Sequence, residues 1–224
     1  MEHFVDSALG AGPFLQSVFA FKQRIERVGQ INSLGQTLLK LASPGTTDIY
    51  QGCELWDLSL VDPDNRRPVD FAARARLLDT LEKPDWDRLV KNWSSGHLKL
   101  AWTRQLLRLR TELADVFTDG DYEPLEVSGQ HRDHFIAFAR RHGRNAAIVV
   151  VPRSFADFTD HGRSWPDPTR YDAALNVSGY AVEGFADTDA TQLRLSDLLA
   201  HLPVAVLKAR FNGAAKPSRK RHRA

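Results

Sequence analysis

The hydrophobic pattern of this chain changes its period once, near residue 118. Upstream, apolar residues recur at helical spacing, most clearly from His97 to Leu113. Downstream, short apolar runs such as Phe135–Ala139 and Ala146–Val151 are separated by turn residues. A 3.6-residue spacing indicates one face of a helix, whereas short bounded runs indicate strands. The change therefore predicts a mainly helical part followed by a small antiparallel β-sheet domain.

The expected elements follow from this pattern and from residues that start or stop helices. Pro13 suits a first helical turn, Gly29 is expected to end that helix, and Ser94 or Ser95 is a plausible cap for the helix that starts near His97. The expected helices are 4–9, 13–29, 31–41, 70–82 and 97–113. The expected strands are 48–52, 122–127, 134–140, 145–152, 172–177 and 190–195, with one more inside 198–207.

Composition places the chain among cytoplasmic globular proteins. Apolar residues make up 42% of its 224 residues, which is enough for a core. The single cysteine, Cys53, excludes an internal disulfide and fits a reducing compartment. The N-terminus lacks the basic and apolar regions of a secretory signal, and no apolar run approaches the roughly 20 residues that span a bilayer. We therefore expect a cytoplasmic location and no membrane partner.

Basic charge is concentrated at the C-terminus. The formal net charge is +2, and the tail at 211–224 carries Lys216, Arg219, Lys220, Arg221 and Arg223, without which the rest would be about −3. Such a tail can contact nucleic acid or a membrane, or can be a solvated, disordered terminus. We favour the disordered terminus, because no basic face with interleaved aromatic residues continues into the expected folded part.

A long polar segment, 43–70, separates the helices and is expected to form an ordered, ligand-facing loop. Its large apolar residues, among them Trp56, are not typical of disorder. Its carboxylates could form a glycosidase pair, or could cap turns and pair with arginines, and the second alternative is the more common one. These carboxylates are Asp48, Glu54, Asp57, Asp62, Asp64 and Asp70. Trp56 and Tyr50 could stack on a sugar or belong to the core.

Several other chemistries are not favoured by the sequence. The eight histidines show no metal-ligand spacing, and His131 and His134 are expected to be a surface pair. Cys53 has no recognisable catalytic partner, so a buried, inert thiol is expected. The chain contains no phosphate-binding glycine loop, and we expect neither a metal nor a cofactor.

Two consecutive motifs resemble a known family. The segments SPGTTDIYQGCELW, from Ser43, and LSLVDPDNRRPVD, from Leu58, closely resemble the maltooligosyltrehalose synthases of the α-amylase family. The DPDNRRP core is the most specific part of the match. Weaker resemblance extends from the N-terminal helices to 202–207, and the basic tail lies outside it.

The resemblance implies an α/β plus all-β fold class. Residues 1–117 would be the C-terminal portion of a catalytic (β/α)8 barrel, and 118–210 a C-terminal β-domain. These enzymes convert the reducing-end α-1,4 bond of maltooligosaccharides into an α,α-1,1 bond by intramolecular transglucosylation, a step of trehalose biosynthesis. Tyr50 to Gly52 would lie in the last barrel strand, and the loop after it would wall the sugar pocket at the C-terminal face.

The resemblance also implies which residues bind substrate. Arg66 matches the position that reaches the sugar at the cleavage subsite, and Asp64 is the next candidate. Weaker candidates for lining or bracing the pocket are Tyr50, Gln51, Glu54, Asn65 and Arg67. The family's nucleophilic aspartate, acid/base glutamate and stabilising aspartate lie in motifs that this sequence lacks. No catalytic residue is therefore expected in this chain.

Three hypotheses follow for what the chain does. In the first, it works only with a missing N-terminal catalytic part, because a closed barrel takes about 250 residues and one βα unit precedes 118. In the second, it is a non-catalytic remnant or a carbohydrate-binding module. In the third, which is the weakest, it binds nucleic acid through its tail.

Overall fold

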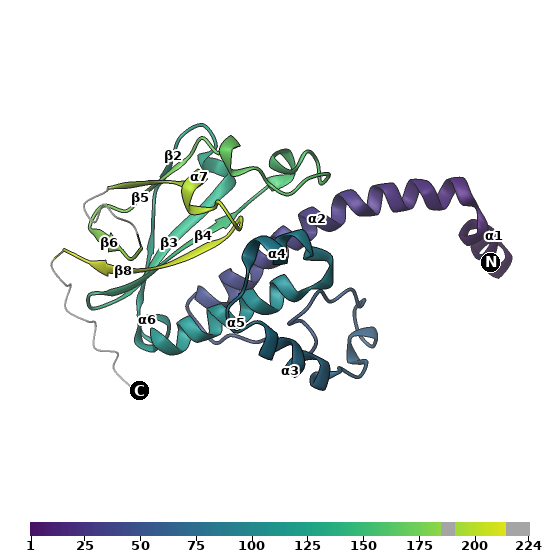
Figure 1. The fold of residues 1–224 in the computed structure, drawn as a ribbon, viewed down its shortest axis with the longest axis horizontal. Coiled ribbons are helices and arrows are strands. Elements are labelled where there is room, and N and C mark those ends of the chain that lie inside the picture. Colours follow the sequence, from purple (N-terminus) through teal and green to yellow (C-terminus); the bar gives the residue numbers. More distant parts are fainter. Residues whose placement is uncertain (185–190, 214–224) are drawn as a thin grey trace.

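A computed structural model describes residues 1–184 and 191–213 (Figure 1). The expected basic tail lies outside these residues, apart from Phe211, Asn212 and Gly213. The helices are α1 (Glu2–Gly10), α2 (Gly12–Ala42), α3 (Phe71–Thr80), α4 (Trp86–Lys91), α5 (His97–Glu112), α6 (Ala114–Thr118) and α7 (Leu195–Leu198). The strands are β1 (Asp121–Pro124), β2 (Val127–Ser128), β3 (Phe135–His142), β4 (Asn145–Pro152), β5 (Ala174–Asn176), β6 (Tyr180–Val182), β7 (Gln192–Arg194) and β8 (Ala205–Phe211).

The strands form two antiparallel sheets. Five strands are ordered β1-β3-β4-β8-β6 and three are ordered β2-β5-β7. The longest pairing joins β3 to β4, with Phe135 opposite Pro152 and His142 opposite Asn145. The antiparallel β-sheet part expected from the sequence is thus confirmed, and helices precede it along the chain.

The five-stranded sheet is buried on both faces. Ala139, Ile148 and Val150 face a core shared with the smaller sheet, whereas Phe138, Val149 and Val151 face the helices. Strands buried on both faces are apolar at nearly every position rather than at alternate positions. This arrangement explains the unbroken apolar runs of β3 and β4, and it places α2 and α5 against the sheet.

Helix α2 is packed against the protein along only part of its length. Its C-terminal half buries Ile31, Leu34, Leu38 and Leu41, while its N-terminal half extends away from the body and carries α1 at its end (Figure 1). Among the described residues no single helix is long and apolar enough to cross a membrane. Together, α1 and α2 meet that length and composition as a pair bent by 74°.

Arg140 of β3 connects α2, α6 and the sheet. It is 1% exposed and donates to the carbonyl oxygens of Ala42 at 2.8 Å, Phe117 at 3.1 Å and Gly120 at 2.9 Å. Ala42 and Phe117 lie in last turns of α2 and α6, where carbonyl groups lack helical partners. Burial lowers the pKa of Arg140, and the nearby charge of Arg110 lowers it further.

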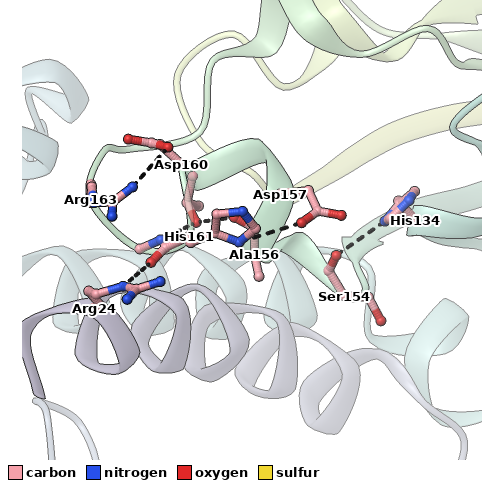
Figure 2. Close-up of polar contacts among 10 residues, drawn as sticks. Arg24, His134, Ser154, Ala156, Asp157, Asp160, His161 and Arg163 are labelled. Carbon is pink, nitrogen blue, oxygen red and sulfur yellow. Dashed lines mark hydrogen bonds and ion pairs between the residues drawn. The ribbon is translucent and has the colours of Figure 1, made fainter. Parts of the chain in front are cut away.

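A turn at 154–163 holds the middle of α2 (Figure 2). The Arg24 guanidinium donates to the carbonyl of His161 at 3.3 Å, and that of Arg27 donates to the carbonyl of Gly162 at 3.2 Å. Gly162 has φ +86°, and a Cβ atom there would lie 1.9 Å from the Arg24 carbonyl oxygen. The turn also holds Ser154, Asp160 and His161 at positive φ. Its position therefore depends on the glycine, which lets the two backbones approach.

Several expected helix boundaries were wrong. Gly29 does not end a helix, because α2 continues through it and buries its next turns, and this burial outweighs the roughly 1 kcal/mol that a helical glycine costs. The residue that caps α5 is Gly96, although the Ser95 hydroxyl accepts from the His97 amide at 3.3 Å. The helices expected at 70–82 and 97–113 are confirmed as α3 and α5.

Two strand predictions also differ from the structure. The segment expected as strand 48–52 is irregular up to Tyr50 and then turns, because neither described sheet offers it a partner. The strand expected at 122–127 is two strands in different sheets, since the chain crosses between them after Pro124. The sequence pattern missed β6, a three-residue edge strand.

We expect Arg140→Met to lower the free energy of unfolding by at least about 2 kcal/mol, because it leaves buried carbonyl groups without donors. Urea denaturation followed by circular dichroism measures the change. Arg153→Met is the matched control, since Arg153 also donates to a carbonyl, that of Asp133, but is exposed. Equal effects of the two substitutions would contradict a special role for Arg140.

We expect Gly162→Ala to lower the free energy of unfolding by clearly more than about 1 kcal/mol, because the added methyl meets the Arg24 carbonyl as well as a positive φ. Gly143→Ala is the control, since Gly143 also has a positive φ of +60° but no atom within 4 Å of the added Cβ. Comparing their urea midpoints isolates the contact with α2. A smaller loss for Gly162→Ala than for the control would be inconsistent with this contact.

Candidate functional site

The loop at 43–70 leaves the C-terminus of α2 and is anchored beside the N-terminus of α5. Trp56 donates from its indole nitrogen to the Trp93 carbonyl at 2.6 Å, and Leu55 and Trp56 pack against the core of the helices. Gly96 permits this approach, because a Cβ atom there would lie 3.1 Å from the Trp56 amide nitrogen. The loop is therefore fixed to the protein body through Leu55 and Trp56, whereas Leu58, Leu60 and Val61 are exposed and do not anchor it.

The DPDNRRP motif folds into a short 3-10 helix, η1 (Asp64–Arg66), braced by two ion pairs. Arg66 pairs with Asp62, and Arg67 pairs with Asp64. Asp64 also accepts from the Leu60 amide at 2.7 Å. Both arginine side chains remain mostly exposed, at 68% for Arg66 and 78% for Arg67. The motif thus presents two guanidinium groups at the surface, each held by a local carboxylate.

A second set of contacts closes the base of the loop. Arg74 of α3 donates to Glu54 at 3.1 Å and to the Gly52 carbonyl at 3.3 Å. Asp70 caps α3 by accepting from the Ala73 amide at 2.8 Å. The alternative in which most loop carboxylates cap turns or pair with arginines is confirmed for Glu54, Asp62, Asp64 and Asp70.

The remaining candidates occupy different positions. Tyr50 and Gln51 are exposed at the start of the turn, away from the paired arginines in sequence. Asn65 is half-buried, and its Oδ1 atom has no hydrogen-bond partner among the described residues. The structure therefore groups Asp64, Asn65 and Arg66 on η1 with Arg67 directly after it, and it places Glu54 with Arg74 as a brace.

Cys53 lies against a small polar cluster. Its thiol donates to Asp57 at 3.5 Å, and burial together with this carboxylate raises the pKa of Cys53. Two hydrogen bonds from Ser59 lower the pKa of Asp57. Lys99 of α5 is 9% exposed, and its burial lowers its pKa. These effects disfavour the thiolate form of Cys53, whose side chain is half-buried rather than buried as expected.

A cavity of about 410 Å³ opens between α2 and this loop; we call it the Trp56 pocket. Its polar lining includes Gln30 and Lys99, which were not among the sequence candidates. The signal that could have revealed them is a polar residue on an otherwise buried helix face. Gln30 lies four residues before buried Leu34, and Lys99 lies three residues before buried Trp102. Such positions are costly unless a polar partner is available.

Comparison with known proteins gives a consistent result. No protein-family model matches the chain. Two curated relatives from Mycobacterium tuberculosis, strains CDC 1551 / Oshkosh and ATCC 25618 / H37Rv, are named maltooligosyl trehalose synthase and are 36% identical over 187 residues. That match covers 79% of this chain and 22% of each relative.

Solved structures agree with these relatives. The maltooligosyltrehalose synthase of Arthrobacter ramosus matches with a TM-score of 0.67 and 33% identity, covering 88% of this chain and 24% of its own. A point mutant of that enzyme matches with a TM-score of 0.71 and 32% identity, covering 92% and 26%. This chain is a homologue of the maltooligosyltrehalose synthases. It corresponds to the C-terminal part of these synthases and spans about a quarter of their length.

We expect Cys53 to react with iodoacetamide more slowly at pH 8 than an unperturbed thiol does, because its raised pKa leaves less thiolate at that pH. Replacing Asp57 with Asn removes the neighbouring charge, lowers the thiol pKa and should speed alkylation severalfold. The chain has one cysteine, so mass spectrometry reads the rate directly. An unchanged or slower rate in Asp57→Asn would contradict the assigned cause.

Proposed function

We propose that this chain provides the last section of the catalytic barrel and the C-terminal β-domain of a maltooligosyltrehalose synthase. The reaction would convert the reducing-end α-1,4 bond of a maltooligosaccharide into an α,α-1,1 bond by intramolecular transglucosylation. The family relationship and the two ion-paired arginines of the DPDNRRP motif support this proposal. A cytoplasmic location accompanies it, in keeping with the single cysteine.

Arg66 is the residue that we assign to the sugar. An arginine presents several donors in a rigid fork, and these donors suit sugar hydroxyl groups and developing negative charge. Asp62 orients the Arg66 side chain while leaving most of it exposed. Asp64, on this short helix, pairs with Arg67 just after it, and this ion pair braces the motif around Arg66. Tyr50, Gln51 and Glu54 line or brace the pocket from the turn before it.

The bond-breaking carboxylates would come from the rest of the synthase. Retaining glycosidase chemistry uses a nucleophile and an acid/base group about 5–5.5 Å apart. Four of the six loop carboxylates, Glu54, Asp62, Asp64 and Asp70, are paired with arginines or cap a helix instead. The proposed partner is therefore the N-terminal catalytic part of the same kind of enzyme, and we expect this chain alone to be inactive.

The decisive experiment is an assay for trehalose-ended product from maltopentaose. The chain is assayed alone and after co-expression with the N-terminal part of the Arthrobacter ramosus synthase. Product on co-expression only is the expected result. Product from the chain alone would show that this chain does carry catalytic carboxylates. No product in either case would favour a non-catalytic remnant.

In the co-expressed enzyme, we expect Arg66→Ala to lower kcat by about 100-fold, because the sugar loses a donor that positions it for the transfer. Its folding should change little, since the Arg66 side chain is largely exposed. Arg76→Ala is the control, because Arg76 is an exposed arginine on neighbouring α3. Near-normal turnover in Arg66→Ala would remove Arg66 from the site.

A further inference from the structure

The Trp56 pocket is lined by a buried amide oxygen without a partner, that of Gln30, and by a largely buried lysine, Lys99. Gln30 is 7% exposed, and its Oε1 atom has no hydrogen-bond partner in the described structure. Lys99 is 9% exposed, and no acceptor in residues 1–184 or 191–213 is hydrogen-bonded to its ammonium group. Leaving the Gln30 oxygen unpaired costs free energy, so a ligand that donates to this oxygen and accepts from Lys99 would bind favourably.

The charges around the pocket balance. Lys22 and Glu26 pair at 2.7 Å, and Asp57 offsets Lys99. A pocket with no net charge favours a neutral ligand over a phosphate or a carboxylate. Gln30 can donate and accept, Lys99 donates and Asp57 accepts, a set that suits hydroxyl groups, which do both.

The remaining walls are apolar. The Trp56 ring is half-buried, with the Lys99 ammonium 5.8 Å from its centroid, and Ile25 and Leu58 are exposed around the opening. Ligand sites commonly combine such walls with a few placed polar groups. A sugar ring carries C–H groups on its faces and hydroxyl groups on its edge, so it matches both parts of this lining.

We infer that the Trp56 pocket binds one glucosyl unit of a maltooligosaccharide, at a place separate from η1. This inference rests on the proposed function, because it assigns a second contact to the same class of substrate. Trp56 and Asp57 belong to the loop that also carries Arg66, so one loop would contact the sugar chain at two places. Gln30 and Lys99 would fix the hydroxyl groups from α2 and α5.

The test is isothermal titration of the whole chain, alone, with maltopentaose. We expect saturable binding, which Gln30→Leu and Lys99→Met each weaken at least tenfold. Lys91→Met serves as the control for Lys99→Met, because Lys91 is an exposed lysine on α4. Circular dichroism confirms that each variant is folded, and Gln30→Leu, which keeps the side-chain volume, decides the question if Lys99→Met does not fold.

Three results would overturn the inference. The first is that the unmodified chain does not bind maltopentaose. The second is that Arg66→Ala loses binding while Gln30→Leu retains it. The third is that inorganic phosphate competes with maltopentaose, which would indicate an anion site. The product assay of the co-expressed enzyme is independent of this titration. Product without pocket binding would reject the pocket alone, and pocket binding without product would reject the proposed function alone.

Discussion

The packing of the helices against the sheet depends on a buried arginine that has no carboxylate partner in the described structure. Arg140 replaces water at the ends of α2 and α6 by donating to three carbonyl oxygens. Charged donors form stronger hydrogen bonds than neutral ones, which compensates for burying the guanidinium. Arg110 adds a further hydrogen bond to the carbonyl of Leu41, so two arginines complete the C-terminus of α2. The direction in which the chain enters the site loop follows from that helix end.

The sequence predicted those parts of the fold in which local pattern and burial agree. The apolar runs of β3 and β4 and the stripe of α5 are such cases. Gly29 misled because a glycine signal is local, whereas the burial that keeps α2 helical comes from the sheet. The strand predicted at 48–52 does not form, because a strand needs a neighbouring strand and the described sheets supply none.

In the candidate site, too, the sequence predicted the contacts between residues that are close in sequence and missed those between distant segments. The pairs Asp62–Arg66 and Asp64–Arg67 are close in sequence, so the motif itself indicates them. Glu54 and Arg74 are 20 residues apart, and nothing local connects them. Arg140 looks like a surface residue in sequence, because its acceptors come from distant segments, Ala42 being 98 residues away. Gln30 and Lys99 were missed for the same reason, since their burial depends on the packing of α2, α5 and the loop.

The partly packed α2 has a consequence for the integrity of the chain. Its N-terminal half exposes Phe14, Val18, Phe21 and Ile25, spaced alternately by four and three residues along one side. Short helices are marginal in water without tertiary contacts. This half of α2 is therefore the place where proteases should cut first and where self-association should begin, unless another protein surface covers the stripe. A cleavage pattern that changes when the stripe is covered would report assembly directly, before any sugar is added.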